Sequence, residues 1–189
     1  MKSFVFCFIM LFTAMAATLA KTLPSSSGQG TVDQTFGKLA GKTEYDAVQI
    51  FICPCGQSIS TISSDHSNHH EDRHFNMSCK PTAASNPPCY VSNFVNNFDE
   101  SFVFTCPEND VLAGIFSYHS NHYEDRRFAF YCCSATIQFS GCAWTPYLNN
   151  FDQTFSYHTL SDQYIAGMSA YHRDNYEDRR FRLYICQKQ

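Results

Sequence analysis

Short apolar runs separated by polar clusters follow one another from Tyr45 to the end of the chain. In the runs at 128–132 (FAFYC) and 181–185 (FRLYI), large apolar side chains recur at alternate positions. On an extended strand such side chains point to one face, where they can be buried. No stretch keeps the spacing of three and four residues that an amphipathic helix needs. The pattern predicts an all-β domain built of many short strands.

One decapeptide occurs three times, as HSNHHEDRHF from His66, HSNHYEDRRF from His119 and HRDNYEDRRF from His172. The two intervals are equal, since 119 − 66 = 53 and 172 − 119 = 53. The tripeptide NFD at 97–99 recurs at 150–152 with the same period. A fixed period of this length indicates a repeat architecture. We therefore predict three units, covering about residues 44–96, 97–149 and 150–189.

Each unit offers about four strands. In the middle unit we expect them at 101–106, 111–118, 126–133 and 135–140. Three such units around a pseudo-threefold axis predict a disulfide-stabilised β-trefoil or β-prism-like domain. Closing the sheets in either way would protect the strand edges.

The first 20 residues have the layout of a secretory signal peptide, with one basic residue (Lys2), an apolar block and small residues before Lys21. The block is too short for a transmembrane helix, which needs about 20 apolar residues. Residues 21–43 are rich in Ser, Gly and Thr and are expected to form a flexible lead-in to a domain at 44–189. We expect a protein secreted to the extracellular space or matrix, with no membrane-spanning segment.

The chain has 13 Lys+Arg and 17 Asp+Glu among 189 residues, a formal net charge of −4. Without the signal peptide and its Lys2 the balance is 12 against 17, or −5. A mildly acidic chain gives no electrostatic reason to bind nucleic acid or anionic lipid.

The polar residues recur about equally in each unit, whereas an active site needs one unique arrangement of reacting groups. We therefore expect no enzyme and no cofactor. His66, His119 and His172 recur once per unit, and symmetry could gather them on the axis or spread them over three loops. Because a zinc site needs three or four ligands held together, we expect polar surface loops and no metal.

In the middle unit Glu124 and Arg126 precede Phe128 and Phe130 on the same face of the expected strand. The two phenylalanines are predicted core residues, so the charges lie at the rim of the core and must be paired. We expect structural Glu–Arg pairs or aspartate caps on the turns. The alternative is a charged cluster that binds a ligand.

The decapeptide, followed by an apolar run and cysteine, resembles the dermatopontin family, which includes lectin-like haemagglutinins, amebocyte aggregation factors and a cytotoxin. The resemblance covers about residues 44–189. Phe75, Phe128 and Phe181 stand where vertebrate members are expected to have Trp, which favours an invertebrate-type member. The resemblance implies a matrix or cell-adhesion protein that binds proteoglycans, or a glycan-binding agglutinin, without enzymatic activity. The alternative is a secreted cytolytic component.

Glycans, glycosaminoglycans or proteoglycans of the matrix or cell surface are therefore the expected partners. Sugars are bound by planar polar groups beside an aromatic face, and arginines can bind sulfate or carboxylate. The three repeated loops offer both kinds of side chain. The expected glycan-binding residues are His66, Asn68, His119, Asn121, Tyr123, Arg126, His172, Asp174, Tyr176 and Arg179.

Cysteines in a secreted chain indicate disulfides. Their register predicts the pairs Cys53–Cys79, Cys89–Cys132, Cys106–Cys133 and Cys142–Cys186, which leaves Cys55 free or in a covalent homodimer.

Two kinds of modification are also considered. Asn76 heads an N-glycosylation sequon and should face solvent if that sequon is used. The family resemblance implies tyrosine sulfation, for which Tyr123 and Tyr176 are candidates.

Overall fold

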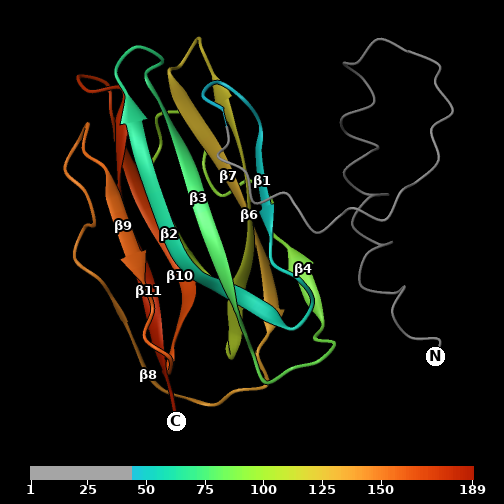
Figure 1. Cartoon of the computed structure of the whole chain (residues 1–189). Coiled ribbons are helices and arrows are strands. Elements are labelled where there is room, and N and C mark those ends of the chain that lie inside the picture. Colours follow the sequence, from blue (N-terminus) through green and yellow to red (C-terminus); the bar gives the residue numbers. More distant parts are fainter. Residues whose placement is uncertain (1–43) are drawn as a thin grey trace, which may run out of the picture. The chain divides into compact units, whose positions relative to one another are not determined.

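The computed structural model describes residues 44–189, so the predicted signal peptide (1–20) and lead-in (21–43) lie outside the described residues. Within 44–189 every regular element is a strand, which confirms the all-β prediction, and no helix is long and apolar enough to cross a membrane. The strands (Figure 1) are β1 Gln49–Ile52, β2 Gln57–Ser67, β3 Asp72–Pro81, β4 Cys89–Val91, β5 Phe102–Thr105, β6 Asp110–Ser120, β7 Asp125–Ser134, β8 Phe139–Trp144, β9 Phe155–His158, β10 Gln163–Arg173 and β11 Asp178–Lys188.

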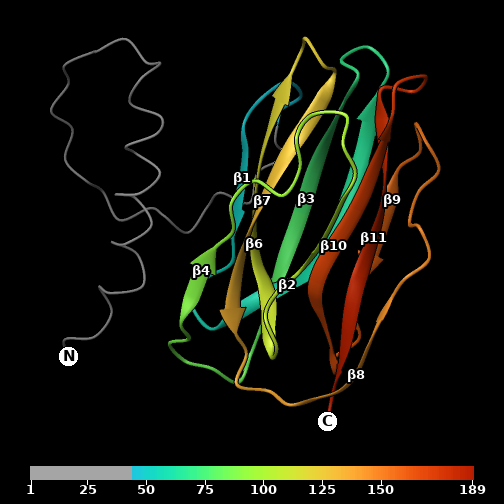
Figure 2. The ribbon, with the colours of Figure 1, turned by 180° about the vertical axis from the view of Figure 1, so that it is seen from behind.

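Three long hairpins, β2–β3, β6–β7 and β10–β11, dominate the structure (Figures 1 and 2). Their first strands begin at Gln57, Asp110 and Gln163, at the 53-residue period of the sequence. Each hairpin forms the centre of its own antiparallel sheet, with strand orders β3-β2-β9, β1-β6-β7-β4 and β5-β10-β11-β8. Three separate sheets match the β-prism-like alternative.

The first strand of each unit pairs with the hairpin of the next unit. Strand β1 pairs with β6, β5 with β10, and β9 of the last unit returns to β2 of the first. A β-bulge at the same place in each hairpin bends the receiving strand. The carbonyls of the bulge residues Ala113, Ala166 and Ser60 accept hydrogen bonds from Cys53, Cys106 and Thr159, at 2.7, 2.8 and 2.9 Å. Because of this cyclic exchange, the sheet around each hairpin contains a strand from another unit.

The fourth strand of the middle unit differs from its prediction. Residues 135–138 are not in a strand, and β8 begins only at Phe139 and pairs with β11 of the following unit. The chain turns away from its own hairpin at Thr136, which has a left-handed φ of 51°, while Ala135 N–H donates to the Asn109 carbonyl. Strand β4 likewise pairs with β7 of the unit after its own.

Three phenylalanines of the core, Phe75, Phe128 and Phe181, come one from each hairpin. Their rings contact one another edge to face, with centroids 5.4–6.1 Å apart, a favoured geometry for aromatic pairs. Phe128, Phe130, Phe181 and Leu183 are at most 1% exposed, as their alternation predicted. The repeated pattern thus places equivalent side chains from three units in one core.

Two of the predicted disulfides are confirmed, Cys53–Cys79 and Cys142–Cys186, and two are wrong. Cys132 pairs with Cys106, and Cys133 pairs with Cys89. Consecutive residues of β7 point to opposite sides, so Cys132 is fully buried while Cys133 lies opposite Cys89 on β4.

The 53-residue period agrees with the observed pairs, because Cys132 follows Cys79 by 53 residues and Cys186 follows Cys133 by 53. The bridges across 26 residues join different sheets, whereas those across 44 residues fasten the edge strands β4 and β8. Cys55 is exposed, and its place in a covalent dimer stays a prediction.

Candidate functional site

The repeated decapeptide forms the tip of each hairpin. The glutamate before each second strand, Glu71, Glu124 or Glu177, has a left-handed φ of 42–45°. This conformation is uncommon for residues other than glycine. It ends the turn and directs the following aspartate inward. Asp72, Asp125 and Asp178 are accordingly 3–4% exposed.

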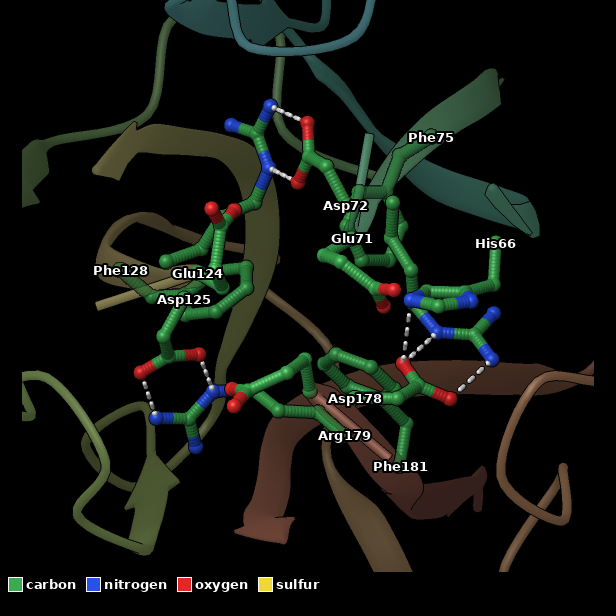
Figure 3. A pocket seen from close by; sticks show the side chains of 13 residues that line it. His66, Glu71, Asp72, Phe75, Glu124, Asp125, Phe128, Asp178, Arg179 and Phe181 are labelled. Atoms are coloured by element: carbon green, nitrogen blue, oxygen red, sulfur yellow. Dashed lines mark hydrogen bonds and ion pairs between the residues drawn. The ribbon is translucent and has the colours of Figure 1, made fainter. Parts of the chain in front are cut away.

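These aspartates and the following arginines form a closed ring of ion pairs around the pseudo-threefold axis (Figure 3). Each pair joins two units through two hydrogen bonds. Arg126 Nε and Nη2 donate to Asp72, both at 2.6 Å, and Arg179 donates to Asp125 at the same distances. Arg73 closes the ring by donating to Asp178 at 2.5 and 2.8 Å. Two-pronged pairs of this kind are among the strong hydrogen bonds of proteins.

The predicted Glu–Arg pairs are therefore wrong, because each arginine pairs with an aspartate of another unit and not with a glutamate of its own. The carboxylates also accept backbone N–H groups. Those of Asp46, Asp99 and Asp152 donate to Asp72, Asp125 and Asp178, at 2.8–2.9 Å. Burial by itself would raise the pKa of Asp72, but His119 and Arg126 outweigh it and lower the pKa to about 2.

The ring surrounds a small axial cavity of about 20 Å³ above Phe75, Phe128 and Phe181. That volume is enough for about one water molecule. Figure 3 shows the labelled carboxylates and phenylalanines around this cavity, with His66 beside Asp178. The ring therefore has a structural role and joins the three units, in line with the structural alternative from the sequence. Its cavity has no room for a sugar.

The side chain of the first histidine of each decapeptide is buried. The side chains of His66, His119 and His172 are 1%, 0% and 1% exposed, so their predicted placement in surface loops is wrong. Each one contacts acidic groups of the preceding unit in the cycle. His119 Nδ1 lies 3.0 Å from Asp72, and His66 Nδ1 lies 3.6 Å from Asp152.

Each contact between one of these histidines and the preceding unit forms a junction between units. Two of these junctions bring possible metal ligands together. Their His and carboxylate atoms lie within 4.8 Å of one another in the groups Asp46–Asp72–His119 and His66–Asp152–Asp178. In both groups the buried aspartate already accepts two hydrogen bonds from an arginine.

The other expected glycan-binding residues fall into two groups. Arg126 and Arg179 are buried in the ring and cannot reach a sulfate. Tyr123 and Tyr176 lie on the surface, 45% and 47% exposed, where their rings stack on Phe98 and Phe151 with centroids 4.7 and 4.6 Å apart. The polar residues at the loop tips, Asn68, Asn121 and Asp174, are also exposed.

One junction opens into a groove of about 420 Å³, between the residues preceding β5 and the tip of the β10–β11 hairpin. It is lined by Asp99, Ser101, Tyr171, His172, Arg173, Asp174 and Asn175. The sequence identified His172 and Asp174 but missed the other five. Asp99 belongs to the repeated NFD tripeptide, so its period was visible although no role was assigned to it.

The part of the chain that the structure describes is also the part that matches a known family. The sequence model of the Dermatopontin family matches residues 43–189. The chain is 40% identical to the hemagglutinin/amebocyte aggregation factor of Limulus polyphemus over 76% of this chain and 84% of that protein.

Two further relatives show the range of the similarity. The chain is 38% identical to Millepora cytotoxin-1 of Millepora dichotoma, over 76% of this chain and 64% of that protein. It is 27% identical to human dermatopontin over 71% of this chain and 70% of that protein. No solved structure matches the chain significantly. The family model and the relatives agree with the motif and establish that the chain belongs to the dermatopontin family.

Proposed function

We propose that this protein is secreted and acts in adhesion or agglutination by binding glycans in the groove beside His172. The groove is the observation that carries the proposal. Its volume of about 420 Å³ falls in the usual range for small-molecule sites. Within it a hydroxyl, an amide, two carboxylates and a guanidinium converge on one space, and these are the groups that bind sugar hydroxyls.

The charge of the groove restricts the class of glycan. Asp99 and Asp174 face it with Arg173 as the only lysine or arginine of its lining. Two carboxylates repel sulfate and uronate groups, while they accept hydrogen bonds from hydroxyl and amino groups. We therefore favour neutral or amino sugars over sulfated glycosaminoglycans at this site.

Aromatic surface lies beside the groove. Tyr171 lines it, and Phe151 contacts both the Tyr171 ring and, by stacking, the Tyr176 ring. Arg180 supports the same cluster, because it donates to the Tyr171 hydroxyl at 3.2 Å. A ring held in this way can cover the apolar face of a sugar at little cost in conformational entropy.

A glycan array compared between two double variants tests the proposal. Ser101→Ala together with Asn175→Ala removes two polar groups of the groove, and binding should fall at least about tenfold. Ser85→Ala together with Asn86→Ala makes the same changes at exposed residues between β3 and β4 and should leave binding unchanged. Equal binding by both double variants would reject the groove as the glycan site.

The identity to Millepora cytotoxin-1 supports a second candidate, a secreted cytolytic component. Haemolysis and haemagglutination measured on the same cells separate the two functions. Agglutination without release of haemoglobin supports adhesion, and release at concentrations that do not agglutinate supports the cytolytic function.

A further inference from the structure

We infer that Asp99, His172 and Asp174 form a binding site for one divalent metal ion in this groove. His172 Nδ1 lies 3.7 Å from Asp99 Oδ1 and 3.5 Å from Asp174 Oδ1. All three side chains line the same open cavity. The three ligand atoms do not yet all lie within 4.8 Å of one another, so the exposed Asp174 side chain must move towards Asp99 before one imidazole nitrogen and two carboxylate oxygens can hold an ion.

The state of His172 is independent evidence for a ligand. Its side chain is 1% exposed, yet within the described residues neither ring nitrogen has a hydrogen-bond partner. A buried polar atom without a hydrogen-bond partner destabilises the folded protein. A metal ion bound to Nδ1 would supply the missing interaction.

The opposite ring nitrogen has the surroundings that metal-binding histidines commonly have. His172 Nε2 lies 3.6 Å from Glu177 Oε2, although it forms no hydrogen bond there. With a metal ion on Nδ1 the proton of the imidazole would be on Nε2, where the Glu177 carboxylate is placed to accept it.

The groove also has more acidic than basic side chains, with Asp99 and Asp174 against the single Arg173. Within residues 44–189 no lysine or arginine forms an ion pair with Asp99 or Asp174, whose side chains are 45% and 87% exposed. Asp99 and Asp174 line the same groove, where their negative charges repel each other. A divalent cation would relieve this repulsion.

The third junction has a carboxylate where the other two have an amide. The positions equivalent to Asp174, one and two periods earlier, are Asn121 and Asn68. At the second junction His119 Nδ1 is only 3.0 Å from Asp72, whose oxygens accept hydrogen bonds from Arg126. The metal site is therefore specific to the last unit, although the sequence repeats suggested three equivalent loops and no metal.

The ligand set indicates the kind of ion. Imidazole nitrogen with carboxylate oxygens suits Mn²⁺ or Zn²⁺, whereas Ca²⁺ is held by oxygen ligands. Three protein ligands leave open positions, and the hydroxyls of a sugar in the groove could occupy them. This last step rests on the proposed function, while metal binding itself does not.

Binding of Mn²⁺ to the folded, metal-stripped protein, followed by electron paramagnetic resonance, tests the site without any glycan. The wild type should bind one ion per molecule, and Zn²⁺ should displace it. Asp174→Asn gives the last loop the side chain of the other two and should weaken binding at least about tenfold. Glu108→Gln removes the same charge at an exposed position before β6 and should have no effect. Glycan binding is then measured with and without a chelator.

Loss of glycan binding in the chelator, with its recovery on adding Mn²⁺ or Zn²⁺, supports a metal that contacts the sugar. Failure of the wild type to bind Mn²⁺, or equal binding by Asp174→Asn, overturns the metal site whatever the glycan result. If Mn²⁺ binds but the chelator leaves glycan binding intact, the role of the metal in recognition is wrong and the proposed function stands. If Mn²⁺ binds and no glycan does, the proposed function is wrong and the metal site stands.

Discussion

Among individual residues, the buried aspartates of the ring have the largest expected effect on stability. Asp125 is 4% exposed and neutralises Arg179, which is itself 3% exposed. We predict that Asp125→Asn lowers the free energy of unfolding by about 3–5 kcal/mol, because it leaves the guanidinium buried without a counter-charge. Urea unfolding measures this loss, with the surface variant Glu108→Gln as the control. A loss below about 1 kcal/mol would contradict the structural role of the ring.

The same ring makes stability depend on pH. Burial acts to raise the pKa of Asp72, but the hydrogen bonds from His119 and Arg126 dominate and lower it from 3.8 to about 2. Because the folded-state pKa is the lower one, this stabilisation of about 2 kcal/mol is present above pH 4 and disappears as the pH falls towards 2. We predict that the difference in unfolding free energy between the wild type and Asp72→Asn shrinks across this window. A difference that is constant from pH 7 to pH 2.5 would contradict the prediction.

Among the strands, the seam between β9 and β11 lacks the covalent bond that the two equivalent seams, between β1 and β3 and between β5 and β7, have. Cys53–Cys79 and Cys106–Cys132 join sheets across Cα distances of 5.8 Å. One period after Cys106 and Cys132 stand Thr159 and Ile185. The Thr159 hydroxyl is buried without a hydrogen-bond partner among the described residues, so its replacement removes an unsatisfied group.

We predict that Thr159→Cys combined with Ile185→Cys forms a third disulfide between sheets. Closing a loop of this length stabilises a protein by about 3 kcal/mol in the chain-entropy model. Thermal unfolding with and without reductant measures the gain. The single variant Thr159→Cys is the control and should show no gain that reductant removes. If the double variant forms the bond without added stability, the seam is strained in a way that its two counterparts are not.

For the whole molecule, the cyclic arrangement predicts that the units cannot fold separately. The last unit supplies β9 to the sheet of the first and Asp178 to Arg73. We predict that residues 44–149, with Cys142→Ser to avoid an unpaired thiol, show no cooperative unfolding transition by circular dichroism. The full domain 44–189 is the reference and should unfold in one sharp transition. A sharp transition in the shorter chain would show that two units suffice.

The sequence by itself determined the strands and the shared core. Alternating positions such as Phe128 and Phe130 identified buried faces because strand geometry is local. The 53-residue period predicted three equivalent units because similar sequences adopt similar local structures. The same period agrees with all four disulfides, because Cys132 is one period after Cys79 and Cys186 is one period after Cys133.

The tertiary structure decided which units meet. The pairing of Arg126 with Asp72, rather than with a glutamate of its own loop, depends on the cyclic exchange of strands between units. That exchange is a long-range property, because Thr61 of β2 pairs with His158 of β9 across 97 positions of the sequence. It also buries His172 and brings Asp99 beside Asp174, residues 75 positions apart in the sequence. The groove therefore arises from packing between units, which no single repeat contains.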